Sequence, residues 1–259
     1  IFIGKNCGGG SWTGDQSDKN IAIGNESMGG AMNNTTYNVC VGTEAGKVIT
    51  GDGNTCVGHQ SGVAIAEGTY STCVGYGAGY GISSGGNNLL LGHGAGQAGS
   101  PSGNITGESS EICLGNNSIV EAHVKVDWTI DSDERDKTDI TNFTHGLDYV
   151  NELRPVNFVW DMRSDYVERQ SDEDGNRIPI TEEEIINAVR DGSKKGSDVQ
   201  LGFIAQEVQA IEDSLGIDNN CIVDTKREDF YKMKSAKMIP VLVNAIKELS
   251  AKVTALENA

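Results

Sequence analysis

The chain of 259 residues is long enough for one large domain or for two domains of ordinary size. Its net charge of −17 argues against nucleic-acid binding, because phosphate would be repelled over most of the surface. No apolar run approaches the roughly 20 residues that cross a bilayer, so we expect no membrane insertion.

Glycine is distributed unevenly along the chain. Residues 1–130 contain 28 of the 34 glycines, and residues 131–259 contain the other 6. This change predicts two different kinds of polypeptide, and we place their boundary between residues 127 and 128. The sequence starts inside a repeat with Ile1 instead of Met, so we expect the natural N-terminus to lie upstream.

The first part repeats a motif of three mostly apolar residues followed by glycine. A nearly fixed period of this kind predicts a stack of similar turns. The seven copies are IFIG (1–4), IAIG (21–24), VCVG (39–42), TCVG (55–58), TCVG (72–75), LLLG (89–92) and ICLG (112–115).

Each motif predicts a three-residue strand whose middle side chain points away from the outer two. Val39 and Val41 then share one face and Cys40 lies on the other, and both faces are apolar. One face can fill the interior of a solenoid, whereas the other requires a neighbour, most simply another copy of the chain. Asn38 and its equivalents, four residues before the glycine, are expected to bond their own backbone or to stack between turns.

Cysteine and histidine also recur at fixed repeat positions. The cysteines lack the paired close spacing of a zinc site and are interpreted as small buried side chains, so we expect no metal or other cofactor. His59 and His93 follow the glycine and are interpreted as turn or surface residues, the alternative being a ring around an ion in a symmetric trimer. The four equivalent cysteines are Cys40, Cys56, Cys73 and Cys113.

These repeats resemble the glycine-rich, trimeric β-solenoids of viral tail fibres and of trimeric adhesin heads. The resemblance is architectural, and it brings no catalytic residues with it. It implies a trimeric β-solenoid of short strands over residues 1–127.

The second part has helical and strand patterns of an α+β, mainly helical domain. Apolar residues in 138–155 have helical spacing, 156–160 alternates like a strand, and Thr181 with Glu184 forms a capping-box pattern for a helix over 181–192. Residues 201–216 are typical of a strand or turn that enters a helix.

The C-terminal residues 239–257 predict a helix with a heptad seam. The pattern indicates a short coiled coil, the alternative being an amphipathic helix packed on its own domain. β-Branched residues alternating with leucine would by themselves favour a dimer, but the seam is too short to decide the number of chains. The seam consists of Ile239, Leu242, Ile246, Leu249, Val253 and Leu256.

Four segments of this part, in order, resemble one protein family. They are SDERDK (132–137), LDYVNELRPVNFVW (147–160), LGFIAQEVQAI (201–211) and VLVNAIKELSAKVTAL (241–256). The family is the intramolecular chaperone auto-processing domain at the C-terminus of phage tailspikes, endosialidases and neck appendages, which also resembles part of the myelin regulatory factor proteins. The resemblance covers about residues 128–259. It departs at Asp136, where the family usually has an apolar residue, and at residues 212–220, which replace a proline-containing stretch.

The resemblance implies a trimeric fibre that cuts its own chain between Asp131 and Ser132. Ser132 would be the nucleophile and Lys137 its base, so the chain would act once, on itself, as a serine endopeptidase with a Ser-Lys dyad. Asp133 would orient the lysine or the backbone. Supporting roles fall to Arg135, which would stabilise an oxyanion or pair with an acid, and to Gln206 and Glu207. Because Asp136 departs from the family pattern, cleavage is expected to be slow.

The chemistry of this segment is constrained independently of the family. A serine hydroxyl needs a base to act as a nucleophile, and a lysine in water titrates near pH ~10.4, so the base must be desolvated. A closed trimer interface would desolvate it, whereas a solvated linker would not. On a regular helix, five residues place two side chains roughly 140° apart, so Ser132 and Lys137 must meet on a turn or across chains.

Three functions compete at this point. The first is the distal part of a phage tail fibre or spike, a virion component assembled in the host cytoplasm, whose solenoid contacts a host receptor or glycan. The second is a polysaccharide-degrading tailspike, whose paired carboxylates would have to lie upstream, because acids are sparse and unpaired in the repeats. The third is a membrane-linked transcription factor, which would need a basic DNA-binding region and a membrane span that this sequence lacks.

Overall fold

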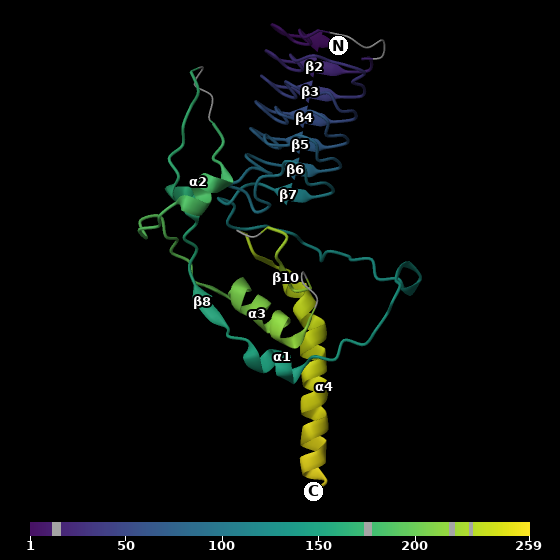
Figure 1. Ribbon diagram of the computed structural model, residues 1–259, viewed down its shortest axis with the longest axis vertical. Coiled ribbons are helices and arrows are strands. Elements are labelled where there is room, and N and C mark those ends of the chain that lie inside the picture. Colours follow the sequence, from purple (N-terminus) through teal and green to yellow (C-terminus); the bar gives the residue numbers. More distant parts are fainter. Residues whose placement is uncertain (12–16, 174–177, 218–220, 228–229) are drawn as a thin grey trace. The chain divides into compact units, whose positions relative to one another are not determined.

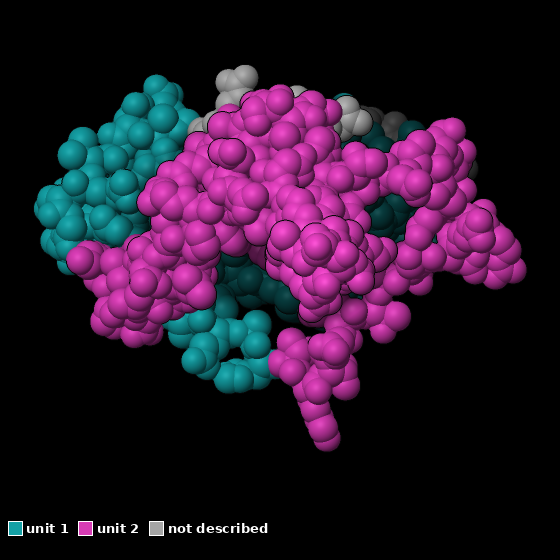
Figure 2. Space-filling model, turned by 90° about the horizontal axis from the view of Figure 1, so that it is seen from below, with its two compact units in different colours: residues 1–123, 161–194 teal, residues 124–160, 195–259 magenta. Residues whose placement is uncertain are grey.

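A computed structural model describes residues 1–11, 17–173, 178–217, 221–227 and 230–259 of the chain (Figure 1). The chain forms two compact units, coloured separately in Figure 2. Unit 1 contains residues 1–123 and 161–194, and unit 2 contains residues 124–160 and 195–259. The boundary between residues 127 and 128 stays a prediction. Part of the 212–220 segment, residues 218–220, lies outside the described residues.

The predicted β-solenoid is confirmed in residues 1–11 and 17–115. Each of the seven repeats supplies one short strand, and the strands stack in chain order as one parallel sheet without register shifts (Figure 1). Neighbouring repeats therefore place equivalent residues directly above one another. The strands are β1 (Phe2–Ile3), β2 (Ile21–Ile23), β3 (Val39–Val41), β4 (Thr55–Val57), β5 (Thr72–Val74), β6 (Leu89–Leu91) and β7 (Ile112–Leu114).

The middle residue of each strand from β2 to β7 is buried inside the solenoid, as its pattern predicts. Cys40, Cys56 and Cys73 pair with one another in register and are fully buried. The hydrogen bond that the Cys73 thiol donates to its neighbour Cys56, together with burial, raises the pKa of Cys73 far above its usual value. These cysteines are therefore unreactive core residues of the kind that the repeat position indicates.

Buried asparagines join successive turns of the solenoid beside the strands. The side-chain oxygen of Asn38 accepts a hydrogen bond from the backbone N–H of Asn54 at 2.8 Å, and its amide donates to the carbonyl of Gly51 at 3.0 Å. Asn20 repeats the first bond one turn earlier, toward the N–H of Asn38 at 2.9 Å. The predicted stacking of these asparagines is thus observed, and it satisfies backbone groups that the turns leave unpaired.

The outer residues of the strands form a second apolar face that points away from the interior. Ile23, Val74 and Leu91 are each more than a third exposed, and Ile112 is 67% exposed. The solenoid interior does not cover these side chains. The expectation that this face needs a neighbour is therefore consistent with its exposure in the single chain.

The two repeat histidines belong to an aromatic stack on the turn that follows the strands. The ring of His59 is parallel to that of Tyr76 with centroids 5.0 Å apart, and Tyr76 meets His93 edge-on at 5.5 Å. The amide of Asn116 lies 3.1 Å from Nδ1 of His93. This arrangement agrees with the interpretation of both histidines as turn residues.

The repeated geometry of the turns depends on the glycine directly after each strand. Gly42 has a φ of +139°, and a Cβ added to it would lie only 2.4 Å from the carbonyl oxygen of Gly58 in the next turn. We expect Gly42→Ala to destabilise the protein by at least about 3 kcal/mol, because the strained backbone and the clash add together. The measurement is the free energy of unfolding of the intact protein.

Gly192 is the matched control for this substitution. It also has a positive φ, +81°, but nothing lies within 4 Å of an added Cβ. Gly192→Ala should therefore cost only about 1–2 kcal/mol. Equal losses from the two substitutions would contradict the role assigned to close stacking at Gly42.

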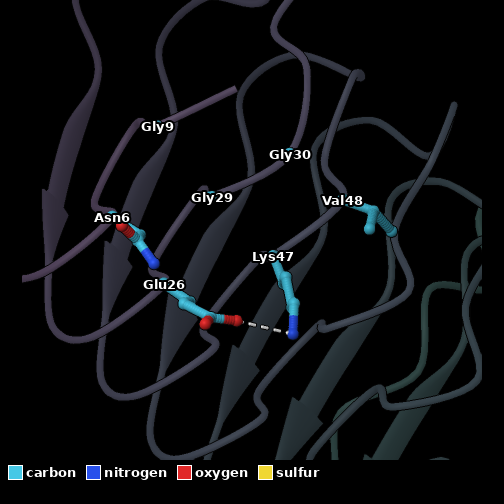
Figure 3. Close-up of a pocket in the computed structure, with 7 residues that line it drawn as sticks. All are labelled: Asn6, Gly9, Glu26, Gly29, Gly30, Lys47 and Val48. Atoms are coloured by element: carbon cyan, nitrogen blue, oxygen red, sulfur yellow. Dashed lines mark ion pairs between the residues drawn. The ribbon is translucent and has the colours of Figure 1, made fainter. Parts of the chain in front are cut away.

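A shallow hollow of about 340 Å³ lies on the solenoid near its N-terminal end (Figure 3). Nζ of Lys47 lies 2.7 Å from carboxylate oxygens of both Glu26 and Glu44. The hydrogen bond to Glu26, and after it the one to Glu44, raises the pKa of Lys47. The charged groups of the hollow thus neutralise one another, and we assign no ligand to it. Its lining residues are Asn6, Gly9, Glu26, Gly29, Gly30, Lys47 and Val48.

The residues after the solenoid form short helices, short strands and one long helix, which confirms the predicted helical C-terminal part. Among the described residues, no helix combines the length and apolar character needed to cross a bilayer. In order, the elements are the 3₁₀ turn η1 (Glu134–Asp136), α1 (Leu147–Glu152), β8 (Val156–Phe158), η2 (Arg163–Tyr166), α2 (Glu182–Asn187), β9 (Gln200–Gly202), α3 (Ala205–Leu215), β10 (Val223–Asp224), β11 (Lys232–Met233), η3 (Ser235–Lys237) and α4 (Met238–Glu257).

Two helices are shorter than the sequence predicts. The helix predicted from 138–155 is restricted to α1, because Gly146 begins it and the preceding segment is extended against α4. The helix predicted over 181–192 ends at Asn187, although the capping box of Thr181 and Glu184 forms as predicted. Within unit 1, the neighbouring Glu182 accepts a hydrogen bond from the backbone N–H of Asn104.

Unit 2 has its own small core. Tyr149 of α1, Val208 of α3 and Val241 of α4 pack together with Val223 of β10 and with Ile222, which precedes that strand. The fully buried Glu212 of α3 accepts hydrogen bonds from the backbone N–H groups of Ile222 and Val223 at 2.9 and 3.2 Å. The carboxylate therefore fixes β10 to α3 by satisfying two backbone donors.

Candidate functional site

The segment between β7, the last strand of the solenoid, and α1 contains the turn η1. Asp133 occupies its N-cap position, and its side chain accepts a hydrogen bond from the backbone N–H of Arg135 at 2.9 Å. Aspartate is a favoured N-cap because its carboxylate satisfies a backbone donor that the turn leaves free. Lys137 follows the turn with an extended backbone.

The turn brings Ser132 and Lys137 into direct contact within one chain. Nζ of Lys137 donates to Oγ of Ser132 at 2.6 Å and to the carbonyl oxygen of Ser132 at 3.0 Å. A regular helix would have separated these side chains around its axis, whereas a single 3₁₀ turn followed by extended backbone closes the gap. Both residues are exposed in the single chain.

Asp133 and Arg135 form a second pair beside the first. Nε and Nη2 of Arg135 lie 3.0 and 2.7 Å from the two carboxylate oxygens of Asp133. These hydrogen bonds to Arg135 lower the pKa of Asp133. Of the alternatives open for Arg135, the structure shows the pairing with an acid, and the Asp133 carboxylate is directed at the turn and at Arg135.

Gln206 and Glu207 lie at the start of α3. Glu207 forms an ion pair with Arg154, whose Nε lies 3.0 Å from Oε2 of Glu207. The hydrogen bond from Arg154 lowers the pKa of Glu207. Gln206 is exposed. The partner of Glu207 in this structure is thus Arg154, two residues after α1, and not the 131–137 segment. A supporting role for Gln206 or Glu207 stays a prediction.

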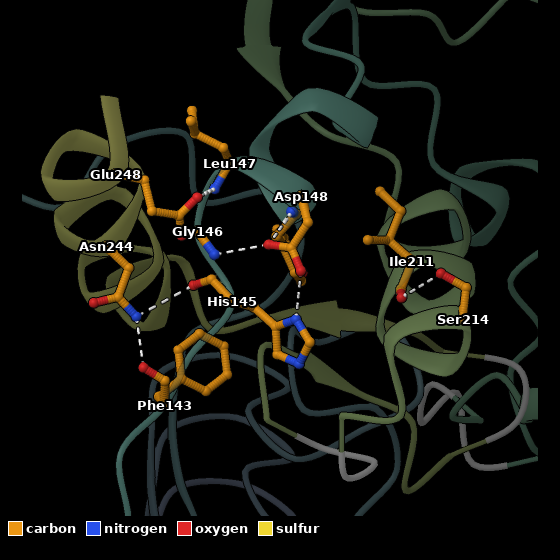
Figure 4. Close-up of polar contacts among 10 residues, drawn as sticks. Phe143, His145, Gly146, Leu147, Asp148, Ile211, Ser214, Asn244 and Glu248 are labelled. Carbon is orange, nitrogen blue, oxygen red and sulfur yellow. Dashed lines mark hydrogen bonds and ion pairs between the residues drawn. The ribbon is translucent and has the colours of Figure 1, made fainter. Parts of the chain in front are cut away.

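Polar contacts attach the segment before α1 to α4 (Figure 4). The amide of Asn244 donates to the carbonyl of Phe143 at 2.6 Å, and a carboxylate oxygen of Glu248 accepts from the backbone N–H of Leu147 at 3.2 Å. A Cβ on Gly146 would lie 2.7 Å from the backbone nitrogen of Ala245 and 2.8 Å from the carbonyl carbon of Asn244, so only glycine fits there. The pattern of apolar residues does not predict these contacts. Gly146, directly before α1, is a signal in the sequence that could have indicated a close approach of another element.

His145 and Asp148 complete this cluster. Nδ1 of His145 lies 2.6 Å from Oδ2 of Asp148, and the other oxygen of Asp148 accepts from the backbone N–H of Gly146 at 2.8 Å (Figure 4). The hydrogen bond with His145 is the main cause of the lowered pKa of Asp148. The start of α1 is therefore held by side chains of its own first turn and of α4.

The heptad seam of α4 is exposed along its whole length. The face that packs within unit 2 is a different one, formed by Met238, Val241 and Ala245. The helix therefore does not use its seam to pack on its own domain. Exposed fractions on the seam are 61% for Ile239, 44% for Leu242, 66% for Ile246, 53% for Leu249, 46% for Val253 and 77% for Leu256.

Metal ligands are not gathered at this segment. In the parts of the chain that the structure describes, no group of three or more His, Cys, Asp or Glu side chains is placed to hold a metal ion. The side chains of residues 131–137 carry one hydroxyl, one amine, one guanidinium and four carboxylates.

Comparison with known proteins identifies the region that begins at Ser132. Residues 132–217 match a family model described as chaperone of endosialidase. No curated protein and no solved structure matches the chain significantly. The match begins at Ser132, and it supports a C-terminal chaperone domain of the endosialidase and tailspike type.

Proposed function

We propose that this chain, with its C-terminal chaperone domain of the endosialidase type, is the distal part of a trimeric phage tail fibre or spike. The domain chaperones assembly of the trimer and then cuts the chain between Asp131 and Ser132. The protein is a virion component that assembles in the host cytoplasm, and its solenoid contacts a host receptor or glycan. The observation that carries cleavage is the 2.6 Å contact between Lys137 and Ser132, at the residue where the family match begins.

Two exposed apolar faces support the trimer. One is the outer face of the solenoid strands, and the other is the seam of α4. Exposed apolar surface of this extent is normally covered by a partner. Other copies of the same chain carry the same two apolar faces in the same order along the sequence. Parallel association of copies can therefore cover the strand face and the seam of α4 together.

The cleavage reaction can be written with the residues of this segment. Oγ of Ser132 attacks the carbonyl carbon of Asp131, and the neutral amine of Lys137 accepts the hydroxyl proton. The bond between Asp131 and the nitrogen of Ser132 then breaks, and that nitrogen takes the proton from Lys137. Water hydrolyses the resulting ester, which leaves a carboxylate on Asp131 and restores the hydroxyl of Ser132.

Assembly of the trimer would control this reaction by excluding water from Lys137. A lysine in water carries a proton at neutral pH and cannot accept another. Because Lys137 is exposed in the single chain, the base becomes available only when a neighbouring chain excludes water from it. Cleavage then follows correct assembly.

The proposal is tested by the mass of the chain after assembly. Purified protein is incubated over several days and its intact mass is recorded at intervals. The proposal requires a fragment that starts at Ser132 in the trimeric fraction and not in monomeric or unfolded chains. The complete absence of this fragment would leave the segment as a linker.

The role of Asp133 can be separated from that of the dyad. Asp133→Asn should retain most of the cleavage rate, because asparagine is also a good N-cap and can accept the bond from the N–H of Arg135. Asp133→Ala removes the cap and should slow cleavage about tenfold, since losing an N-cap costs about 1 kcal/mol and a misplaced dyad costs more. The measurement is the initial rate of fragment formation at fixed pH. Equal rates for the two variants would show that the cap does not position the dyad.

The family description mentions an endosialidase, and this supports a second candidate. In that case the chain is the C-terminal part of a polysaccharide-degrading tailspike whose catalytic site lies upstream of Ile1. Depolymerisation of capsular polysaccharide by the whole natural protein separates this candidate from a non-enzymatic fibre.

A further inference from the structure

One column of residues on the solenoid surface has an unusual composition. It occupies the position two residues before each strand, so in-register pairing places its members one above another. Neighbouring members are about 4.8 Å apart along the stack. All its members have a positive φ in the left-handed region, from 57° at Tyr70 to 69° at Gly53. The column consists of Lys19, Tyr37, Gly53, Tyr70, Asn87 and Ser110.

Tyrosine is a poor choice for this backbone conformation. Gly53 and Asn87 are the residue types that the left-handed region favours, whereas a bulky side chain is strained there. Tyr37 and Tyr70 are nevertheless 60% and 69% exposed, so burial does not compensate for the strain. Residues held in such strained conformations are often found at ligand-binding positions.

Contacts within the column hold both rings in place. A Cβ on Gly53 would lie 2.7 Å from Cδ1 and 2.9 Å from Cε1 of Tyr70, so the ring lies over the space that glycine leaves. Nζ of Lys19 lies 4.7 Å from the ring centroid of Tyr37 and donates to its hydroxyl at 2.9 Å. These contacts favour one position of each ring, which lowers the entropic cost of binding.

The surroundings of the rings are polar. In the turns that follow Tyr70, the side-chain amide of Asn87 donates to the hydroxyl of Ser110 at 3.0 Å. Near Tyr37, a carboxylate oxygen of Asp18 lies 3.8 Å from Nζ of Lys19. Hydroxyl and amide groups beside flat apolar rings suit a ligand that has both apolar faces and many hydroxyls. The strongly acidic chain repels polyanions, which favours an uncharged ligand.

We propose that the tyrosine strip, Tyr37, Gly53 and Tyr70 with Asn87 and Ser110, binds an extended neutral saccharide that lies along the solenoid. The two rings are separated by two turns, about 10 Å, and stack on different sugar rings of one chain. The polar residues beyond Tyr70 bind its hydroxyls. The inference rests on the proposed attachment role of the solenoid, but not on cleavage at Ser132.

The test uses the assembled full-length protein and an array of neutral oligosaccharides, with heparin and an extended neutral peptide as the other arms. Tyr37→Asn and Tyr70→Asn place at each position the residue that Asn87 already uses in the same backbone conformation. We expect each to weaken saccharide binding at least about tenfold without lowering the melting temperature. Tyr70→Phe should keep most of the binding, because it retains the ring.

Val48→Asn is the matched control, because it removes an apolar side chain of similar exposure, 45%, outside the strip. It should leave binding unchanged. Three outcomes would each overturn the proposal. The protein binds no neutral saccharide, it binds only heparin or the peptide, or both asparagine variants bind the saccharide as well as the unmodified protein does. A lowered melting temperature of the asparagine variants would instead show that the rings are structural, and this also overturns it.

Nitration of tyrosine distinguishes a ligand site from a contact between chains. In the assembled protein, both strip tyrosines should react with tetranitromethane, and the bound saccharide should protect them. Resistance without saccharide would show that another copy of the chain covers the strip and would overturn the proposal. Because trimer formation is measured on the same samples, absence of a trimer counts against the proposed function, whereas a cleaving trimer that binds no saccharide counts against the strip alone.

Discussion

Ser132→Ala should abolish formation of the fragment that begins at residue 132 while leaving a full-length trimer. The substitution removes the only hydroxyl that contacts Lys137 among the described residues, at 2.6 Å, from an exposed turn that contributes nothing to either core. Loss of the nucleophile should lower the cleavage rate more than about a thousandfold. Intact mass and light scattering on the same samples measure cleavage and assembly separately.

Lys137→Ala should have the same effect, because the hydroxyl loses its base. Lys137→Arg is the matched control that keeps the charge, and it should also be inactive since arginine does not deprotonate in proteins. Co-expression of Ser132→Ala and Lys137→Ala chains then tests where the pair meets. Because the contact lies within one chain, mixed trimers should stay uncut. Restored cleavage would show a pair formed across chains, and cleavage by both single variants would exclude the mechanism.

Ile246→Asp combined with Leu249→Asp should reduce the yield of trimer to background and produce aggregated chains. Both side chains are more than half exposed in the single chain and belong to the seam that we assign to the trimer. A carboxylate buried in such a seam without a partner costs several kcal/mol, and parallel association brings like charges together. Size-exclusion chromatography with light scattering gives the yield.

The control for this variant adds the same charge to the other face of the same helix. Ala251 and Ala255 are exposed and lie outside the seam, so Ala251→Asp combined with Ala255→Asp should leave the trimer yield nearly unchanged. A normal yield from the seam variant would exclude the chaperone role of α4. A loss of trimer in both variants would point to charge or helix propensity instead of the seam.

Much of the solenoid could be predicted from the sequence because its interactions repeat at a fixed period. Each repeat must bury its middle strand residue, such as Cys40 or Leu90, and must turn at a glycine, so every copy carries the same signal. The long C-terminal helix is similar, since its heptad spacing extends over several turns. Signals of this kind are local, and repetition makes them clear.

The short helices were predicted less well because their ends depend on distant residues. The pattern in 138–155 has helical spacing, but α1 starts at Leu147, where Glu248 and Asn244 of α4 bind the backbone of the preceding segment. No residue near 138 signals this contact, since its partners lie about a hundred positions away in the sequence. Tertiary hydrogen bonds there outweigh weak helix propensity.

For the candidate site, the sequence alone identified Ser132 and Lys137 and showed that they could not meet on a regular helix. The turn η1, capped by Asp133, is what brings their side chains together, and it also pairs Asp133 with Arg135. The sequence likewise placed apolar residues on two faces of each strand and along one seam of α4. Only the tertiary structure decided which of these faces stay exposed, because burial depends on what packs nearby. It also decided the partner of Glu207, because folding brings Arg154 next to it.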